Sequence, residues 1–323
     1  AIALSFVPAL EDVEGSVTGS VTIQGTTQAP EPTGALTLTD AAWSVQEIGV
    51  RHTQVSGDLQ LRADRTVDVT LQSLGTGAAD ITGTVLLEPA SDPQLDLDFT
   101  FDRFLAVSRA DMEGLVSGGF KLSGSYTRPV VEGSVTVEEG TIFVDELQRS
   151  VGVVDLSDPF LFDVGLAVDT TALSAQPLIA GFENPFFDNL RVDVDLAVPR
   201  GSWLRSIETN AELSGDLLVR YDRFAGDFVL IGELQAVRGS HLVLGRSFQL
   251  AGGTVSFIGR PGLNPDLDIQ ASTRIRSPDN PPIDVNAQVG GTLVRPVVTL
   301  TSDQVGLAEE DLISYMLFGR PSG

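Results

Sequence analysis

The stretch PDLDIQASTRIRS, residues 265–277, decides the fold class because its side chains alternate between apolar and polar. Successive side chains of an extended strand point to opposite faces, so this pattern predicts a β-strand with one buried face. The alternation recurs in LDLDFTF (95–101), LRVDVDLAV (190–198) and PPIDVNAQVGG (281–291). Segments rich in Gly, Pro, Ser and Asp separate these strands, as in LEPASDPQ (87–94). The sequence therefore predicts an all-β, antiparallel meander.

Composition excludes several classes of function. The 323 residues carry a net charge of −24, which argues against binding to nucleic acid or to anionic lipid headgroups. The absence of cysteine excludes disulfides, thiolate metal sites and a cysteine nucleophile. No apolar run approaches the ~18 residues of a transmembrane helix. The opening AIALSFVPAL lacks the features of a signal peptide, so we expect a fragment of a longer protein whose membrane anchor lies upstream.

An internal repeat organises the predicted strands. The segments GALTLTDAAWSV, GSVTVEEGTIFV and GELQAVRGSHLV begin at Gly34, Gly133 and Gly232, an even spacing of 99 residues. A Gly followed five positions later by Pro precedes the first two copies and recurs at Gly291 and Pro296. Such a repeat fits either tandem β-sandwiches of ~100 residues or one continuous sheet in which units contact their neighbours. The inward faces are mostly aliphatic, which favours the continuous sheet.

The sequence shows no recognisable catalytic or metal-binding motif. The only histidines, His52 and His241, lie in different repeats without a nearby nucleophile, so we interpret them as ordinary strand residues. The single lysine, Lys121, lies outside any phosphate-binding loop motif. Pairs such as Asp96 and Asp98 fit the solvated face of a strand better than a calcium loop. We expect no enzyme activity, no cofactor and no bound metal.

The segment EEDLISYMLFGRP, residues 309–321, predicts a C-terminal helix. Three acids occupy its first turn, where the helix dipole favours them, and Gly319 with Pro321 ends it. Leu312, Tyr315 and Met316 share one face. We expect a helix within residues 306–319 that docks onto the β-structure through these three side chains.

The last ~120 residues resemble the C-terminal domain of the TamB family, the inner-membrane component of the bacterial translocation and assembly module and a relative of AsmA-like proteins. The resemblance is carried by the order of five segments: AELSGDLLV (211–219), GELQAVRGSHLVLGRSFQLAGGTVSFIG (232–259), NPDLDIQAS (264–272), VGGTLVRPVVTLTSD (289–303) and EEDLISYMLFGR (309–320). We divide the chain into a repetitive β-groove segment, residues 1–210, and a TamB-type segment, residues 211–323.

The resemblance implies an elongated, folded-over antiparallel sheet, shaped like a taco, with a hydrophobic groove and a short C-terminal helix. From the alternation we expect fourteen residues to line this groove: Leu95, Leu97, Phe99, Leu190, Val192, Val194, Leu196, Leu267, Ile269, Ala271, Ile275, Ile283, Val285 and Val289. The family is implicated in phospholipid transport between the membranes and in outer-membrane protein assembly. The implied location is the periplasm, within an inner-membrane-anchored protein that reaches the outer membrane.

The expected function is a hydrophobic conduit for phospholipid acyl chains, with an outer-membrane barrel of the BamA/TamA type as partner. A second possibility is a chaperone that holds nascent outer-membrane β-strands by strand addition and works with the same type of barrel. A third, of another class, is a structural surface protein made of tandem β-sandwiches.

Overall fold

The structure, a computed structural model, describes residues 11–26, 29–45, 49–146, 185–261, 264–276, 281–293, 295–304 and 306–320. The opening segment AIALSFVPAL and Pro321 lie outside these residues. The chain divides into two compact units. The first comprises Ala1–Glu138, Ala175–Ala197 and Leu218–Val229, and the second comprises Glu139–Ser174, Val198–Leu217 and Leu230–Gly323.

Strands dominate the described residues. They are β1 (Glu11–Thr26), β2 (Ala29–Val45), β3 (Val50–Leu61), β4 (Thr66–Ser73), β5 (Ala78–Leu86), β6 (Gln94–Ser108), β7 (Met112–Ser125), β8 (Arg128–Phe143), β9 (Arg191–Arg205), β10 (Thr209–Asp222), β11 (Asp227–Val243), β12 (Arg246–Pro261), β13 (Asp266–Ile275), β14 (Ile283–Gly291) and β15 (Pro296–Ser302). A short helix α2 (Pro185–Asp188) precedes β9, and helix α3 (Glu309–Phe318) follows β15. Neither helix is long and apolar enough to cross a membrane.

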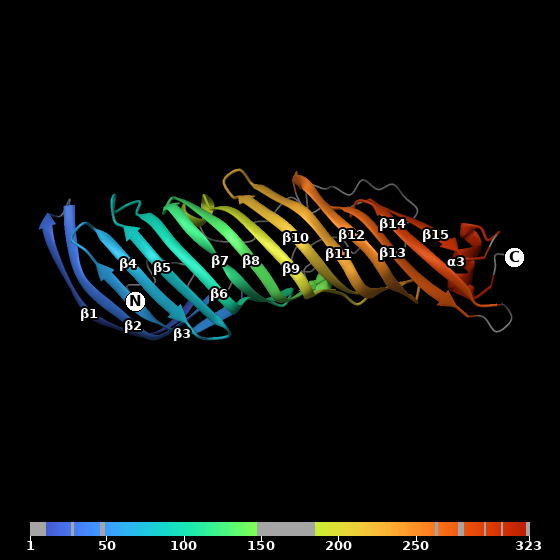
Figure 1. Cartoon of the computed structure of the whole chain (residues 1–323), viewed down its shortest axis with the longest axis horizontal. Coiled ribbons are helices and arrows are strands. Elements are labelled where there is room, and N and C mark those ends of the chain that lie inside the picture. The colour runs from blue at the N-terminus through green and yellow to red at the C-terminus, as the bar shows by residue number, and fades with distance from the viewer. Residues whose placement is uncertain are drawn as a thin grey trace. The chain divides into compact units, whose positions relative to one another are not determined.

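The strands hydrogen-bond in chain order, β1 to β15, in one sheet. Figure 1 shows this succession through β1–β7 in the first unit and β12–β15 in the second. The pairs from β1 to β7 and from β12 to β15 are antiparallel. The predicted all-β meander with a short C-terminal helix is therefore confirmed, and its strands form one sheet in place of tandem sandwiches.

The repeated Gly and Pro signature closes β-hairpins. Gly25 pairs with Pro30 where β1 turns into β2, and Gly291 pairs with Pro296 where β14 turns into β15. Gly291 has a φ of 80°, a left-handed conformation that glycine adopts without strain. An added Cβ at Gly291 would lie 2.5 Å from the Arg295 carbonyl oxygen. The Gly and Pro signature thus marks tight connections between strands, here between β1 and β2 and between β14 and β15.

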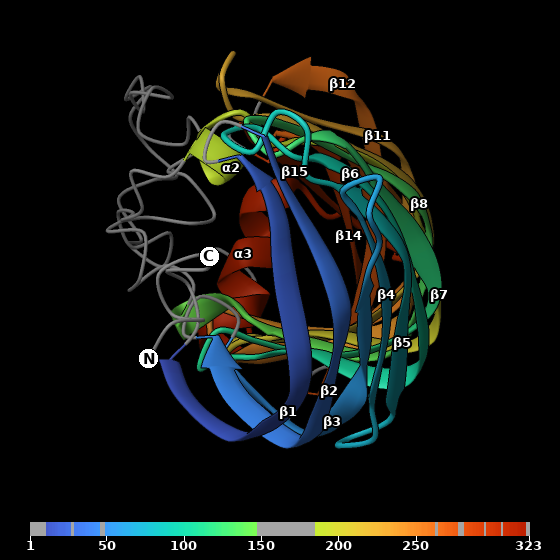
Figure 2. The same ribbon diagram turned by 90° about the vertical axis from the view of Figure 1, so that its left-hand side faces the viewer.

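Long strands of the first unit bend where three polar residues adopt left-handed backbone conformations. Asp40 in β2, Gln54 in β3 and Arg103 in β6 have φ values of 49°, 55° and 47°. Register shifts accompany them between β2 and β3 and between β6 and β7, and such bulges bend a strand. Serine hydroxyls accept the displaced N–H groups: Asp40 N–H donates to Ser56 at 3.2 Å, and Arg103 N–H donates to Ser117 at 3.0 Å. Figure 2 shows β1 to β3, in blue, curving along their length.

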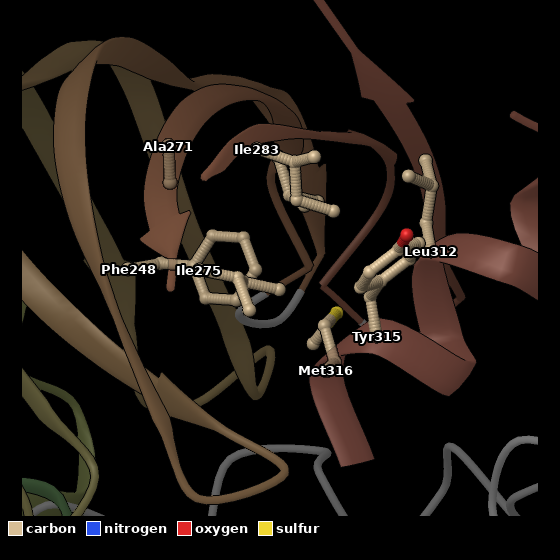
Figure 3. Packing of buried hydrophobic residues seen from close by; sticks show 8 residues of the cluster. Phe248, Ala271, Ile275, Ile283, Leu312, Tyr315 and Met316 are labelled. Carbon is tan, nitrogen blue, oxygen red and sulfur yellow. The ribbon is translucent and has the colours of Figure 1, made fainter. Parts of the chain in front are cut away.

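In the second unit, α3 packs on one face of β12–β14 (Figure 3). Its buried side chains are Leu312, Tyr315 and Met316, the three that the sequence assigned to one face. Asp311 Oδ2 accepts the N–H of Ala308 at 3.3 Å, which caps the first turn. Gly319 ends the helix with a φ of 72°. The helix runs from Glu309 to Phe318, within the expected range of 306–319.

Candidate functional site

One face of strands β3–β7 in the first unit is apolar. We define this apolar face by ten residues: Leu59, Val69, Leu71, Ile81, Val85, Leu95, Leu97, Phe99, Phe120 and Leu122. The register aligns them across neighbouring strands, so that Leu71 faces Ile81, Ile81 faces Phe99, and Phe99 faces Phe120. The alternation within each strand thus becomes rows of apolar side chains that run across the sheet.

The apolar face is partly accessible along its length. Leu95, Leu97 and Phe99, all predicted to line a groove, are half-buried, and every intervening residue of this segment of β6 is exposed. The neighbouring Val69 and Leu122 are more enclosed, with 8% and 9% of their surface exposed. Side chains at the centre of a closed core lose nearly all contact with solvent. The described part of this face is therefore not a closed core, because some of its side chains are enclosed and others are accessible to solvent.

The opposite face of the same strands carries the charge. Lys121 Nζ lies 2.5 Å from Asp96 and 4.0 Å from Asp98, and these two acids expose 60% and 58% of their side chains. The hydrogen bond to Asp96 raises the pKa of Lys121. Among the described residues, no group of three or more His, Cys, Asp or Glu side chains is arranged to hold a metal ion. The Asp pairs therefore lie on a solvated face.

Aromatic rings on β3, β6 and β7 form a chain of contacts in the first unit. Phe99 stacks on Phe120 with ring centroids 4.6 Å apart, and Phe101 lies 5.4 Å from both Phe120 and Phe104. His52 of β3 then stacks on Phe104 of β6 at 5.3 Å. Burial lowers the pKa of His52, which favours its neutral ring. Sequence reasoning missed this contact because β3 and β6 are not neighbours in the sheet.

The four groove residues predicted around β9 also lie half-buried. They are Leu190, Val192, Val194 and Leu196. Leu190 precedes the strand, and its carbonyl oxygen accepts the N–H of Arg223 at 3.1 Å. These side chains alternate with Arg191, Asp193 and Asp195, as the sequence predicted.

The predicted groove residues of β13 and β14 divide into two groups. Leu267, Ile269 and Val289 are half-buried, like the residues of β6. The others lie beneath α3: Ala271, Ile275, Ile283 and Val285 expose 8%, 1%, 1% and 0% of their surface. This differs from the expected open wall, because the apolar side of α3 covers these positions and forms a closed core with them and Phe248 (Figure 3).

A further cluster joins β9, β10 and β11 in the second unit. The guanidinium groups of Arg205 and Arg238 lie 5.5 and 5.4 Å from the centre of the Trp203 ring. Arg238 also donates a hydrogen bond to Glu212, which is 3% exposed and accepts the N–H of Gly201 at 3.0 Å. These hydrogen bonds, that of Arg238 first, lower the pKa of Glu212. No motif in the sequence pointed to this cluster, because its members lie on three strands.

The second histidine is held by a neighbouring strand. His241 Nδ1 lies 2.8 Å from Thr209 Oγ1, and burial lowers the pKa of the imidazole. A hydrogen bond within the sheet accounts for its position, so His241 fits the interpretation of an ordinary strand residue.

Comparison with known proteins identifies the family. Residues 67–323 match the TamB C-terminal domain. This match begins upstream of residue 211, where the resemblance was first placed, and includes most of the apolar face. No curated protein matches the chain significantly. Because the match spans well over half of the chain, the protein belongs to the TamB family of membrane-assembly and lipid-transport components.

Proposed function

We propose that this chain is part of a periplasmic conduit that carries phospholipid acyl chains along its apolar face between the inner and outer membranes. The observation that carries the proposal is the division of β6: half-buried Leu95, Leu97 and Phe99 on one side, exposed Asp96 and Asp98 on the other. The family supports a role in the cell envelope without catalysis.

An acyl chain is stabilised when its methylenes leave water for the apolar face. Each methylene that leaves water for an apolar surface gains about 0.8 kcal/mol, so a wall of apolar side chains stabilises an acyl chain along its whole length. The ten residues of the apolar face carry no charge and no hydrogen-bonding side chain. Such a wall has no fixed point of attachment, which favours sliding over tight binding at one place.

Other parts of the parent protein and its partner would supply the remaining roles. An inner-membrane anchor upstream of this chain would hold it in the periplasm, and an outer-membrane barrel of the BamA/TamA type would receive the lipid. The acidic face supports this arrangement, since a net charge of −24 keeps a protein with a wide apolar surface dispersed in water.

Lipid extraction followed by native mass spectrometry tests the proposal on matched double variants of β6. Leu95→Asn with Leu97→Asn places two amides on the apolar face, and Asp96→Asn with Asp98→Asn places the same two amides on the opposite face. We expect the first variant to lose more than about tenfold in bound lipid, since each lost leucine contributes about 2 kcal/mol. The second should retain lipid as the unchanged protein does. Equal lipid content in both variants would contradict the conduit.

A second candidate function is strand holding, which the last strand of the sheet favours. β15 exposes Val297 by 61% and Val298 by 42%, and a sheet edge can accept an extended peptide by backbone hydrogen bonds. A labelled amphipathic β-peptide tests it by fluorescence anisotropy. The variant Val298→Pro disrupts the geometry of β15. If β15 is the acceptor, this variant should not bind the peptide, and its lipid content should remain unchanged.

A further inference from the structure

Hydrogen bonds hold α3 to the second unit at both of its ends. At the first turn, the Glu309 carboxylate accepts the backbone N–H of Leu300 in β15 at 3.3 Å. At the last turn, Arg246 Nε donates to the carbonyl oxygen of Met316 at 2.9 Å. The cation lies at the carboxyl end of the helix, where it also interacts favourably with the helix dipole. We call these two contacts the latches of α3.

The surface beneath α3 has the chemistry of the apolar face of the first unit. It consists of Phe248, Ile275, Ile283 and Val285, each at most 2% exposed. On β13 the same side of the strand runs from half-buried Ile269, through Ala271, to buried Ile275. A single strand face therefore passes from an accessible stretch to a covered stretch, and the cover is α3 (Figure 3).

The helix is apolar on its outward side as well. Ile313, Leu317 and Phe318 expose 39%, 48% and 72% of their surface. An amphipathic surface helix presents polar residues on the side away from its core, which stabilises it in one orientation. Beyond its acidic first turn, α3 has no polar outer side. It can therefore leave the sheet and contact acyl chains at a smaller cost in free energy than an amphipathic helix would.

We propose that α3 is a releasable cover and that Phe248, Ile275, Ile283 and Val285 form a second acyl-chain-binding surface when it lifts. The inference rests on the proposed function, since it extends the same apolar chemistry into the second unit. Breaking the latches shifts the balance toward the uncovered state, in which an acyl chain replaces the side chains of Leu312, Tyr315 and Met316.

Photo-crosslinking in the full chain tests the cover. The probe is palmitic acid bearing a diazirine, and the labelled peptides are mapped by mass spectrometry. Arg246→Ala with Glu309→Ala breaks both latches. The matched control, Arg260→Ala with Glu233→Ala, removes an arginine whose Nη1 lies 2.9 Å from Asp266 and a glutamate whose Oε1 lies 3.5 Å from Ser256 Oγ.

We expect labelling of β12–β14 to rise about tenfold or more in the latch variant. The two charge-assisted hydrogen bonds together shift the equilibrium toward the covered state by at least that factor. The control should match the unchanged protein. Labelling confined to β3–β7 in every protein would overturn the cover and leave the proposed conduit intact. Labelling that is equal on β12–β14 in all proteins would also overturn it. Absence of labelling throughout would instead overturn the conduit, and the cover with it.

Hydrogen exchange separates release of α3 from unfolding. In the latch variant, amides of α3 should exchange about tenfold or more faster, while those of Asp266–Ile275 and Ile283–Gly291 keep their protection. Loss of protection in these strands together with α3 would show that the helix is an inseparable part of the core and would overturn the inference.

Discussion

Aspartate placed on the apolar side of two adjacent strands should have opposite consequences at Ile269 and Ile283. Both isoleucines occupy apolar positions of the alternating pattern, and β13 and β14 pair with each other. Ile269 is half-buried, whereas Ile283 is 1% exposed beneath α3. We expect Ile269→Asp to leave the sheet folded and Ile283→Asp to destabilise the second unit strongly.

The magnitude follows from the two environments. At Ile283 the substitution removes a buried side chain, at a cost of about 3 kcal/mol, and leaves a carboxyl group without a partner, at a further cost of about 2 kcal/mol or more. At Ile269 the new carboxylate can remain hydrated, so a loss of about 1 kcal/mol in the free energy of unfolding is expected. The difference of about 4 kcal/mol corresponds to roughly 8–16 °C in melting temperature for a unit of this size.

Circular dichroism melts at two pH values measure the prediction. Burial raises the pKa of the carboxyl group introduced at Ile283 above its value in the unfolded chain. The folded state then binds the proton more tightly, so the destabilisation is largest at neutral pH and lessens as the pH falls toward the unfolded pKa. Ile269→Asp should show little such dependence. Equal melting temperatures for the two variants, or an early melt of both, would refute the assignment of an accessible stretch and a covered stretch on this face.

Three further changes probe other contacts. Gly83→Ala should cost about 2–4 kcal/mol in melts, because the added Cβ would lie 2.1 Å from a backbone carbonyl oxygen at a φ of 143°; an unchanged melt would contradict the close approach. Glu212→Gln should destabilise the chain near neutral pH and progressively less in acid, since the hydrogen bond from Arg238 lowers the folded pKa and its contribution is lost as the pH falls. His52→Phe should reduce the loss of stability between pH 8 and pH 5, because burial lowers the pKa of the histidine and unfolding takes up a proton; an unchanged pH slope would contradict this.

Sequence reasoning predicted the strands well because their signal is local. Alternation from Leu95 to Phe101 indicates both the extended backbone and the side of the sheet that each side chain occupies, and β6 contains the whole segment. The same holds for Leu267 and Ile269 in β13. Gly291 and Pro296 were identified as part of an internal repeat, and the structure places them at a hairpin.

The bends of the first unit left no comparable signal. Asp40, Gln54 and Arg103 adopt left-handed conformations that polar non-glycine residues take only where surrounding structure holds them. Their stabilising partners, among them Ser56 and Ser117, lie on other strands. His52 likewise stacks on Phe104 although β4 and β5 separate their strands in the sheet. These contacts require the register of several strands, which no local pattern contains.

The environment of the predicted groove depends on an element that the alternation does not describe. Ile269 and Ile275 belong to one unbroken period-two segment, yet one is half-buried and the other is 1% exposed. Their difference arises from α3, more than thirty residues downstream, whose three buried side chains the sequence places on one face of the helix without indicating the strands that they contact. A period-two pattern identifies which side of a strand avoids water, but a helix, a second strand or a lipid can each shield that side. In this chain helix α3 shields Ile275, and we propose that a lipid shields Leu97.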